Sequence, residues 1–274
     1  MVIVCNIVTR IKLQLYSLAD GSLIRTIDNC GSDDGRTAVG GRAGLCMSPD
    51  GDNVLVAVEY GHRVEQIRIA YKPGSWVRFL GEGVLRFPQY VDCNSAVVVV
   101  SEEKHRIRVL SWVDGSLRAQ FGSKGSGPGQ LFHPRGIRLL AHGGGVVAAD
   151  SGNNRLCVFT LSGEFVTTVG SRQQGLNCPI DVLEFVAEDK FVVANYGSAS
   201  DNAHEVVEFS RDGAKFSFFG QKGEFHCIGA LATLPNGGMV VMKCIGTCFS
   251  VFRGHQLRRQ WVIACVVAAR RGDV

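Results

Sequence analysis

Two stretches in the middle of the chain decide the fold. The first begins at Phe121 and reads Phe-Gly-Ser-Lys-Gly-Ser-Gly-Pro-Gly-Gln-Leu-Phe-His-Pro-Arg-Gly, and the second begins at Asp150 and reads Asp-Ser-Gly-Asn-Asn-Arg-Leu-Cys-Val-Phe. Each places a turn-forming segment directly before an apolar run. Because Gly, Asn and Asp tolerate positive φ at little steric cost, both segments favour tight turns between short β-strands.

The unit built around these stretches predicts four strands separated by turn residues. They are Arg135–Leu140, Val146–Ala149, Arg155–Phe159 and Phe165–Val169. The second strand is almost uniformly apolar, which is typical of a strand buried on both faces. The same kind of apolar run recurs at Val54–Val58, Ala96–Val100, Phe191–Ala194 and Met239–Met242.

This unit is one copy of an internal repeat. Aligning one apolar position gives six anchors separated by 43 to 51 residues, namely Tyr16, Ile67, Leu110, Phe159, Phe209 and Phe252. Repeats of this length made of short strands are typical of propellers. The sequence therefore predicts one domain spanning residues 1–274. Its units lie near 1–28, 43–81, 87–122, 133–170, 178–220 and 226–265.

The two ends of the chain depart from the repeat. The first unit supplies three strands, around Val2–Cys5, Lys12–Leu18 and Leu23–Ile27, and lacks an innermost one. In the last unit Leu257–Val262 is expected to be the final strand, which leaves Ile263–Ala269 to complete the first unit. No turn residues separate these two segments, so a fragment of five and a half units is the alternative to a closed ring.

The composition is that of a globular protein with a mild positive charge. Hydrophobic residues make up 46% and charged residues 20% of the chain, and the net charge is +4. No segment approaches the roughly 20 apolar residues of a membrane span. No leader is recognisable at the N-terminus, so we expect a cytoplasmic protein without a membrane partner. The ten cysteines form no CxxC pair and are expected to be free, buried thiols in a reducing compartment.

The Gly-rich loop, the Pro-x-Gly step and the Asp-x-x-Asn-x-Arg turn of the middle unit resemble the NHL repeat family. This resemblance extends in weaker form over nearly the whole chain and implies an all-β, six-bladed β-propeller. The motif residues are Asp150, Asn153 and Arg155, and Arg63 and Arg106 match the same arginine. A guanidinium can bond carbonyl groups across a turn, so we expect these arginines to be structural.

No catalytic constellation is recognisable, and we expect neither a metal nor a cofactor. Three histidines, His62, His105 and His204, precede the motif arginine or its replacement. Three histidines can hold zinc, and a propeller enzyme similar to this family, the peptidylglycine amidating lyase, binds metal through histidine. The repeat itself already explains why the three histidines recur. We therefore expect a protein that is not an enzyme.

One face of the expected propeller carries basic and aromatic side chains. The loops between units and the turns between second and third strands contribute the candidate binding residues Arg36, Arg42, Tyr60, Arg86, His105, Lys124, Arg135, Arg172, Tyr196 and Lys222. The leading hypothesis is a monomeric scaffold for protein–protein interaction. The alternative is single-stranded RNA, where bases stack on aromatic rings and arginine neutralises phosphate. The family also includes substrate-recognition parts of ubiquitin-ligase systems.

Overall fold

The computed structural model of the chain is an all-β protein. It describes residues 2–7, 11–17, 20–30, 44–69, 75–141, 144–197, 204–219, 225, 228–234, 238–243, 248–253 and 256–262. Within these residues the regular structure consists of β-strands and three single-turn 3₁₀ helices, with no α-helix. This agrees with the absence of a 3.6-residue apolar period in the sequence.

Within the part of the chain that the structure describes, the strands form six separate antiparallel sheets, one of three strands and five of four. Each sheet is built from strands consecutive in the chain, joined in the order in which they occur. Sheet 1 consists of β1 (Val2–Ile7), β2 (Ile11–Tyr16) and β3 (Leu23–Cys30). Sheet 2 consists of β4 (Leu45–Met47), β5 (Asn53–Val58), β6 (Arg63–Arg68) and β7 (Trp76–Leu80). Sheet 3 consists of β8 (Pro88–Cys93), β9 (Val97–Glu102), β10 (Arg106–Ser111) and β11 (Leu117–Phe121).

The second half of the chain repeats this pattern. Sheet 4 consists of β12 (Pro134–Leu139), β13 (Gly145–Asp150), β14 (Arg155–Thr160) and β15 (Phe165–Val169). Sheet 5 consists of β16 (Pro179–Phe185), β17 (Lys190–Asn195), β18 (Glu205–Ser210) and β19 (Phe216–Phe219). Sheet 6 consists of β20 (Ile228–Thr233), β21 (Met239–Lys243), β22 (Cys248–Arg253) and β23 (Gln256–Val262). The 3₁₀ helices are η1 (Ser151–Asn153), η2 (Arg172–Gln174) and η3 (Val186–Glu188).

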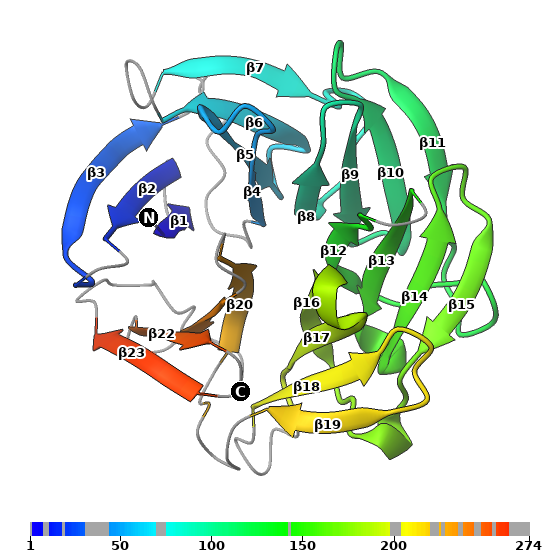
Figure 1. Ribbon diagram of the computed structural model, residues 1–274. Helices are drawn as coiled ribbons and strands as arrows, with labels where there is room; N and C mark the ends of the chain where they lie inside the picture. The colour runs from blue at the N-terminus through cyan, green and yellow to red at the C-terminus, as the bar shows by residue number, and fades with distance from the viewer. Residues whose placement is uncertain are drawn as a thin grey trace, which may run out of the picture.

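The sheets follow one another around a common centre, with the first strand of each four-stranded sheet nearest that centre (Figure 1). Turns between second and third strands and loops between successive sheets therefore lie on one side of the molecule. We call that side the loop face. The remaining turns, between first and second and between third and fourth strands, lie on the opposite face.

The six anchor residues confirm that the sheets are copies of one structural unit. All six are buried, and each lies on the strand that directly precedes the outermost strand of its sheet. In five of the six sheets the pairing with the outermost strand shifts by a β-bulge at the anchor. A bulge increases the local twist, so the outermost strand turns away in the same manner each time. The unit boundaries read from the sequence stay a prediction.

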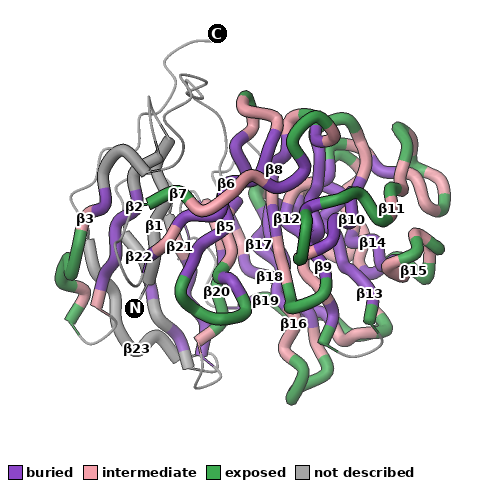
Figure 2. The backbone as a smooth tube through the Cα atoms, turned by 90° about the horizontal axis from the view of Figure 1, so that it is seen from above, coloured by how far each residue is buried: buried purple, intermediate pink, exposed green. Residues whose placement is uncertain are grey.

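The core lies between the sheets. The apolar second strands β5, β9 and β13 are buried along their whole length, as the sequence predicts. Apolar side chains from consecutive sheets fill each boundary, for example Leu13 and Ile27 against Val56 between sheets 1 and 2. Figure 2 shows the buried inner strands and the exposed loops and outer strands.

The Pro-x-Gly step of the sequence has a packing reason. Gly136 lies where the first strands of sheets 4 and 5 meet, and a Cβ at this position would lie 2.5 Å from the Cα of Asp181. Only glycine allows the two backbones to approach so closely. Gly44 occupies the corresponding place between sheets 2 and 3, with the Cα of Tyr90 2.4 Å from an added Cβ.

Two expectations from the sequence concern the last strand segment and the cysteines. Residues Ile263–Ala269, assigned from the sequence to the missing strand of sheet 1, lie outside the described residues. The expectation of buried thiols holds for Cys157 but is wrong for Cys46, Cys93 and Cys178, which are partly exposed. All four are free thiols.

Candidate functional site

The motif turn of sheet 4 clamps the Gly-rich loop that precedes the sheet. The carboxylate of Asp150, at the end of β13, accepts hydrogen bonds from the backbone N–H of Phe132 at 2.6 Å and from Nε of Arg155 at 2.8 Å. The other guanidinium nitrogens of Arg155 donate to the carbonyls of Ser126, Gly127 and Gln130 at 2.8 to 3.0 Å. The amide of Asn153 donates to Gly125 O and to Asp150. These contacts fix a loop whose own backbone structure is limited to turns and the isolated β-bridge between Lys124 and Leu131.

Sheet 3 has a smaller version of this clamp, and in sheet 2 the motif arginine pairs within its own strand. In sheet 3 Glu102 accepts the backbone N–H of Arg86 at 2.6 Å and pairs with Nε of Arg106. In sheet 2 Arg63 is buried, pairs with Glu65 at 2.8 Å and lies 4.2 Å from the ring centre of Phe79. The motif arginines thus make internal contacts in all three sheets.

A second hydrogen bond recurs between successive sheets. The residue before the motif arginine, or before its replacement Glu205 in sheet 5, uses its side chain to accept a backbone N–H from the first residues of the next sheet or from the loop before it. His62 Nδ1 accepts from Phe87 at 3.1 Å, and His105 Nδ1 accepts from His133 at 3.0 Å. Asn154 Oδ1 does the same for Cys178 at 2.8 Å. His204 Nδ1 accepts from Ile228 at 3.3 Å. We call these four contacts the inter-sheet latches.

The latches give the three histidines a role that the sequence reasoning missed. In His62, His105 and His204 the Nδ1 atom accepts a hydrogen bond, so it is occupied and the neutral ring carries its proton on Nε2. Each histidine serves a different sheet boundary. No group of three or more His, Cys, Asp or Glu side chains suited to a metal occurs among the described residues.

Aromatic and basic side chains gather around three of the latches. Tyr60 and His62 pack edge-on against Phe87, and Lys104 Nζ lies 5.6 Å from the centre of the Phe87 ring. We call these four residues cluster A. His105 and His133 pack on Phe132, and Lys124 Nζ lies 5.6 Å from the Phe132 ring. We call these four residues cluster B.

A third group, cluster C, consists of Tyr196 and His204, whose rings meet edge-on at 4.4 Å. Tyr60 and Tyr196 have 41% and 42% of their surface exposed. The structure thus brings Tyr60 into cluster A, His105 and Lys124 into cluster B, and Tyr196 into cluster C.

The other predicted residues are more dispersed. Arg86 is exposed, but its guanidinium bonds the carbonyls of Gly83 and Leu85 within its own loop. Arg135 is partly exposed, and Arg172 is exposed in η2. Arg36, Arg42 and Lys222 lie outside the described residues.

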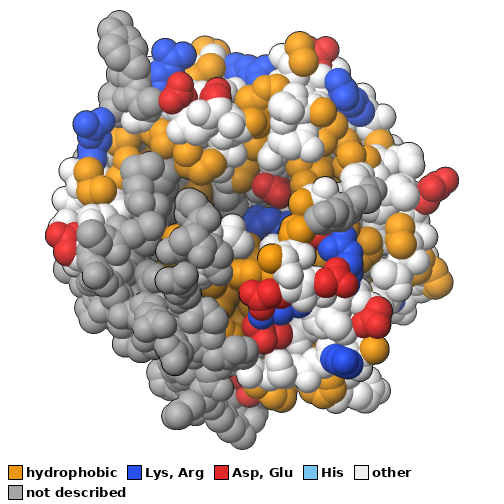
Figure 3. Space-filling view, viewed as in Figure 1, with side chains coloured by type: hydrophobic (Ala, Val, Ile, Leu, Met, Phe, Trp, Pro, Cys, Tyr) orange, Lys and Arg blue, Asp and Glu red, His pale blue; other side chains and the backbone are white. Residues whose placement is uncertain are grey.

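A group of buried charges near the centre was missed from the sequence. On three successive first strands lie Asp92, Arg138 and Asp181, the last two 3.5 Å apart. Asp92 accepts the backbone N–H of Leu139, and Asp181 accepts that of Leu231. Burial raises the pKa of both carboxyl groups, against the lowering effect of Arg138. The available signal was a charged residue among the apolar residues of each of three first strands. These contacts join neighbouring sheets, and Figure 3 shows charged side chains near the central hollow.

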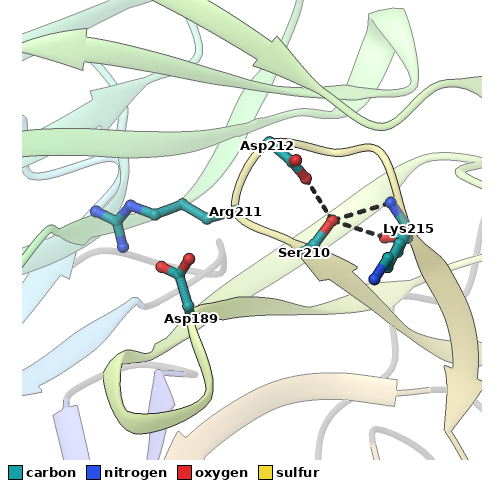
Figure 4. Close-up of a pocket in the computed structure, with 5 residues that line it drawn as sticks. All are labelled: Asp189, Ser210, Arg211, Asp212 and Lys215. Carbon is teal, nitrogen blue, oxygen red and sulfur yellow. Dashed lines mark hydrogen bonds between the residues drawn. The ribbon is translucent and has the colours of Figure 1, made fainter.

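The opposite face carries two adjoining depressions on sheets 4 and 5. One, of about 400 Å³, is lined by Asp189, Ser210, Arg211, Asp212 and Lys215 (Figure 4). The other, of about 370 Å³, is mostly apolar and also reaches Arg211. In the first, Ser210 Oγ donates to Asp212 at 2.6 Å, and Lys215 N donates to Ser210 Oγ. Serine–aspartate bonds also close the turns at Asp20 and Asp114, so the polar lining is a repeated turn.

Comparisons with known proteins support the fold and give a partial relative. No protein-family model matches the chain. A RING finger protein, nhl-1 of Caenorhabditis elegans, is 40% identical over 87 residues. The match covers 27% of this chain and only 9% of that protein.

Two solved structures resemble the fold with a TM-score of 0.59 each. Hydrazine synthase of Kuenenia stuttgartiensis is 15% identical, and the similarity covers 81% of this chain and 66% of that one. A functionally unknown protein from Desulfotomaculum acetoxidans is 14% identical, with 92% and 77% covered. At these identities the likeness concerns the fold alone. Within the described residues no helix has the length and apolar character needed to cross a membrane.

Proposed function

We propose that the chain is a six-bladed NHL-type β-propeller that acts as a non-enzymatic scaffold and binds a protein through its loop face. Five four-stranded sheets and one three-stranded sheet around a common centre support the propeller. The short match to nhl-1 supports the NHL relationship. In this proposal sheets 1 and 6 meet and close the ring.

The observation that carries the binding proposal is the set of half-exposed aromatic side chains on the loop face. Clusters A and C each present one tyrosine that is held by a histidine or phenylalanine beneath it. Tyrosine is enriched among the residues that dominate protein interfaces, because it offers a large, rigid surface at low entropic cost. A pre-positioned ring loses little conformational freedom on binding.

The rest of the loop face supports a binding role more than a catalytic one. The ionisable side chains of the motif turns are engaged in contacts that hold the loops: Asp150 and Arg155 in the clamp, His105 in a latch. These groups position loops and leave the aromatic rings and lysines at the surface. We therefore propose that the loop face recognises shape and charge without performing a reaction.

The test is a comparison of tyrosine variants with a control on the opposite face. The immobilised chain is used to capture partners from a lysate treated with ribonuclease, and the partner is then purified and its affinity measured by calorimetry. Tyr60→Ala and Tyr196→Ala are expected to weaken binding by at least about tenfold. Val113→Ala, at a 75% exposed position in the β10–β11 turn, is expected to leave it unchanged. Unchanged affinity in both tyrosine variants would contradict the proposal.

Single-stranded RNA is the second candidate, and one observation favours it. Lys104 and Lys124 each place an ammonium group 5.6 Å from a phenylalanine ring. Such pairs can neutralise a phosphate while the ring stacks on a base. If RNA is the ligand, binding weakens steeply with rising salt and is lost when Arg86, Lys124 and Arg135 are changed to Glu. Binding that is indifferent to salt would exclude this candidate.

A further inference from the structure

Two cysteines from different sheets lie side by side between sheets 2 and 3. Cys46 is the middle residue of β4, and Cys93 is the last residue of β8. Their Sγ atoms are 3.5 Å apart, with the Cys46 thiol donating to Cys93 Sγ. The Cys93 thiol donates in turn to Met47 O at 3.2 Å. Both residues are partly exposed, and a small oxidant needs to reach only Cys93.

The strands that carry this pair, β4 and β8, lie side by side across the sheet boundary. Gly44 N, two residues before Cys46, donates to Gln89 O at 3.0 Å across the sheet boundary. The close approach of Gly44 to Tyr90 holds the two strands together on the same side. A disulfide needs the sulfur atoms at about 2.05 Å. Closing the remaining gap calls for a modest movement of two side chains whose strands are already in contact.

We propose that Cys46 and Cys93 form a reversible disulfide on exposure to hydrogen peroxide, so that the pair is a modification site that joins sheets 2 and 3 covalently. In the first step the Cys93 thiolate attacks peroxide, giving a sulfenic acid on Cys93 and hydroxide. In the second step the Cys46 sulfur attacks the sulfenic sulfur, the Cys46 proton leaves with the displaced hydroxyl as water, and the disulfide forms. Two thiols and one peroxide thus yield one disulfide and two waters.

The hydrogen bond between the thiols sets the order of these steps. Cys46 donates to Cys93, and this contact together with burial raises the pKa of Cys46 well above its usual range. We assign the first attack to Cys93, because its sulfur accepts this hydrogen bond while Cys46 is the donor. Cys157 offers a contrast, because it is fully buried and burial beside Asp150 raises its pKa to about 12. We expect Cys157 to stay reduced.

Peptide mapping of the intact chain tests the proposal directly. Trypsin cleaves after Arg42, Arg63, Arg86 and Lys104, so peptides 43–63 and 87–104 contain Cys46 and Cys93 respectively, each as its only cysteine. After peroxide treatment under non-reducing conditions, the two peptides are expected as one linked species that has lost two hydrogen atoms. A reductant should return them to separate peptides. Separate peptides at a peroxide dose that oxidises other surface thiols would overturn the proposal.

Serine variants test the order of the steps. In Cys46→Ser the sulfenic acid on Cys93 has no partner and is expected to be trapped by dimedone on peptide 87–104. In Cys93→Ser neither the linked peptide nor a dimedone adduct on peptide 43–63 should appear. Cys178→Ser, at a partly exposed cysteine on another sheet boundary, should leave the linked species unchanged. Dimedone labelling of Cys46 in Cys93→Ser would refute the assigned order. Because the wild-type map needs no variant, a folding defect in one variant leaves the proposal testable.

Discussion

At the scale of single residues, the guanidinium of the motif arginine of sheet 4 donates four hydrogen bonds. Arg155 is 14% exposed, and its partner Asp150 is fully buried. Replacing Arg155 by Ala leaves the Asp150 carboxylate buried without its cation and frees three loop carbonyls. We expect a loss of about 3 kcal/mol in the free energy of unfolding, measured by urea denaturation. Arg155→Lys should lose nearly as much, because an ammonium cannot reach all these acceptors.

The matched control for this prediction is Arg118→Ala. Arg118 is an exposed arginine on β11 whose guanidinium donates a single hydrogen bond, to Ser111 Oγ at 3.2 Å. We expect this change to cost less than about 0.5 kcal/mol. If Arg118→Ala and Arg155→Ala destabilise the chain equally, the clamp does not stabilise the loop.

A second residue-scale prediction concerns the turns of the opposite face. Hydrogen bonds from the Ser116 hydroxyl and backbone N–H lower the pKa of Asp114 from 3.8 to about 2. Its stabilising effect is therefore present above pH 3.8 and is lost as the pH falls toward 2. NMR titration of the Asp114 side chain should give a midpoint near 2, and Ser116→Ala should raise that midpoint. An unchanged midpoint in the variant would show that the serine hydroxyl is not the cause.

At the scale of the elements, the latches explain why the residue before the motif arginine or its replacement is His, His, Asn and His in four successive sheets. His105 has a φ of 63° and Asn154 a φ of 55°, both in the left-handed region. Asn tolerates this region best among non-glycine residues, and its side chain can accept the same backbone N–H. His105→Asn should therefore preserve stability, whereas His105→Ala should cost about 2 kcal/mol from the lost hydrogen bond and the backbone strain.

His105→Gly separates the contribution of the lost hydrogen bond from that of the backbone strain, because glycine removes the acceptor without the strain.

The latch also predicts that stability depends on pH. Burial, followed by the charges of His133 and Lys124, lowers the pKa of His105 below 6.5, against Glu103. The latch therefore stabilises the fold above pH 6.5 and weakens as the pH falls below that value, when the imidazolium can no longer accept. Denaturation curves at several pH values should show a smaller acid-side loss for His105→Asn than for the wild type.

The sequence predicts an element only where the element requires a recognisable pattern of residues. Strand β15 is found where the sequence places it, at Phe165–Val169, because turn residues bound an apolar run. The role of the latch histidines left no such signal, because an acceptor and a metal ligand call for the same residue type. Cys46 and Cys93 are 47 residues apart in the chain and lie on different sheets. The repeat period predicts the sheets but does not specify which side chains meet between them.

At the scale of the whole molecule, the remaining prediction concerns whether the ring of sheets closes. Among the described residues, Leu13, Ile27 and Val56 join sheets 1 and 2. Each following pair of consecutive sheets, up to sheets 5 and 6, is joined by contacts between first strands or by a shared apolar cluster. If the propeller closes as proposed, the boundary that remains is that between sheets 6 and 1. Among the described strands β1 pairs with β2 alone, and because an edge strand offers unpaired backbone groups, its other edge calls for a partner there. The sequence assigns that partner to residues 263–269.

Deleting residues 263–274 tests this closure. If the segment pairs with β1, its removal exposes the amides of Val2–Ile7, and we expect their hydrogen exchange to accelerate by at least about tenfold while that of β13 stays unchanged. The comparison with β13 separates local opening from global unfolding, because a general loss of stability would accelerate exchange in both strands. Unchanged protection of β1 would mean that the ring is closed by other residues or left open. The five-and-a-half-unit alternative would then become the better description of the chain.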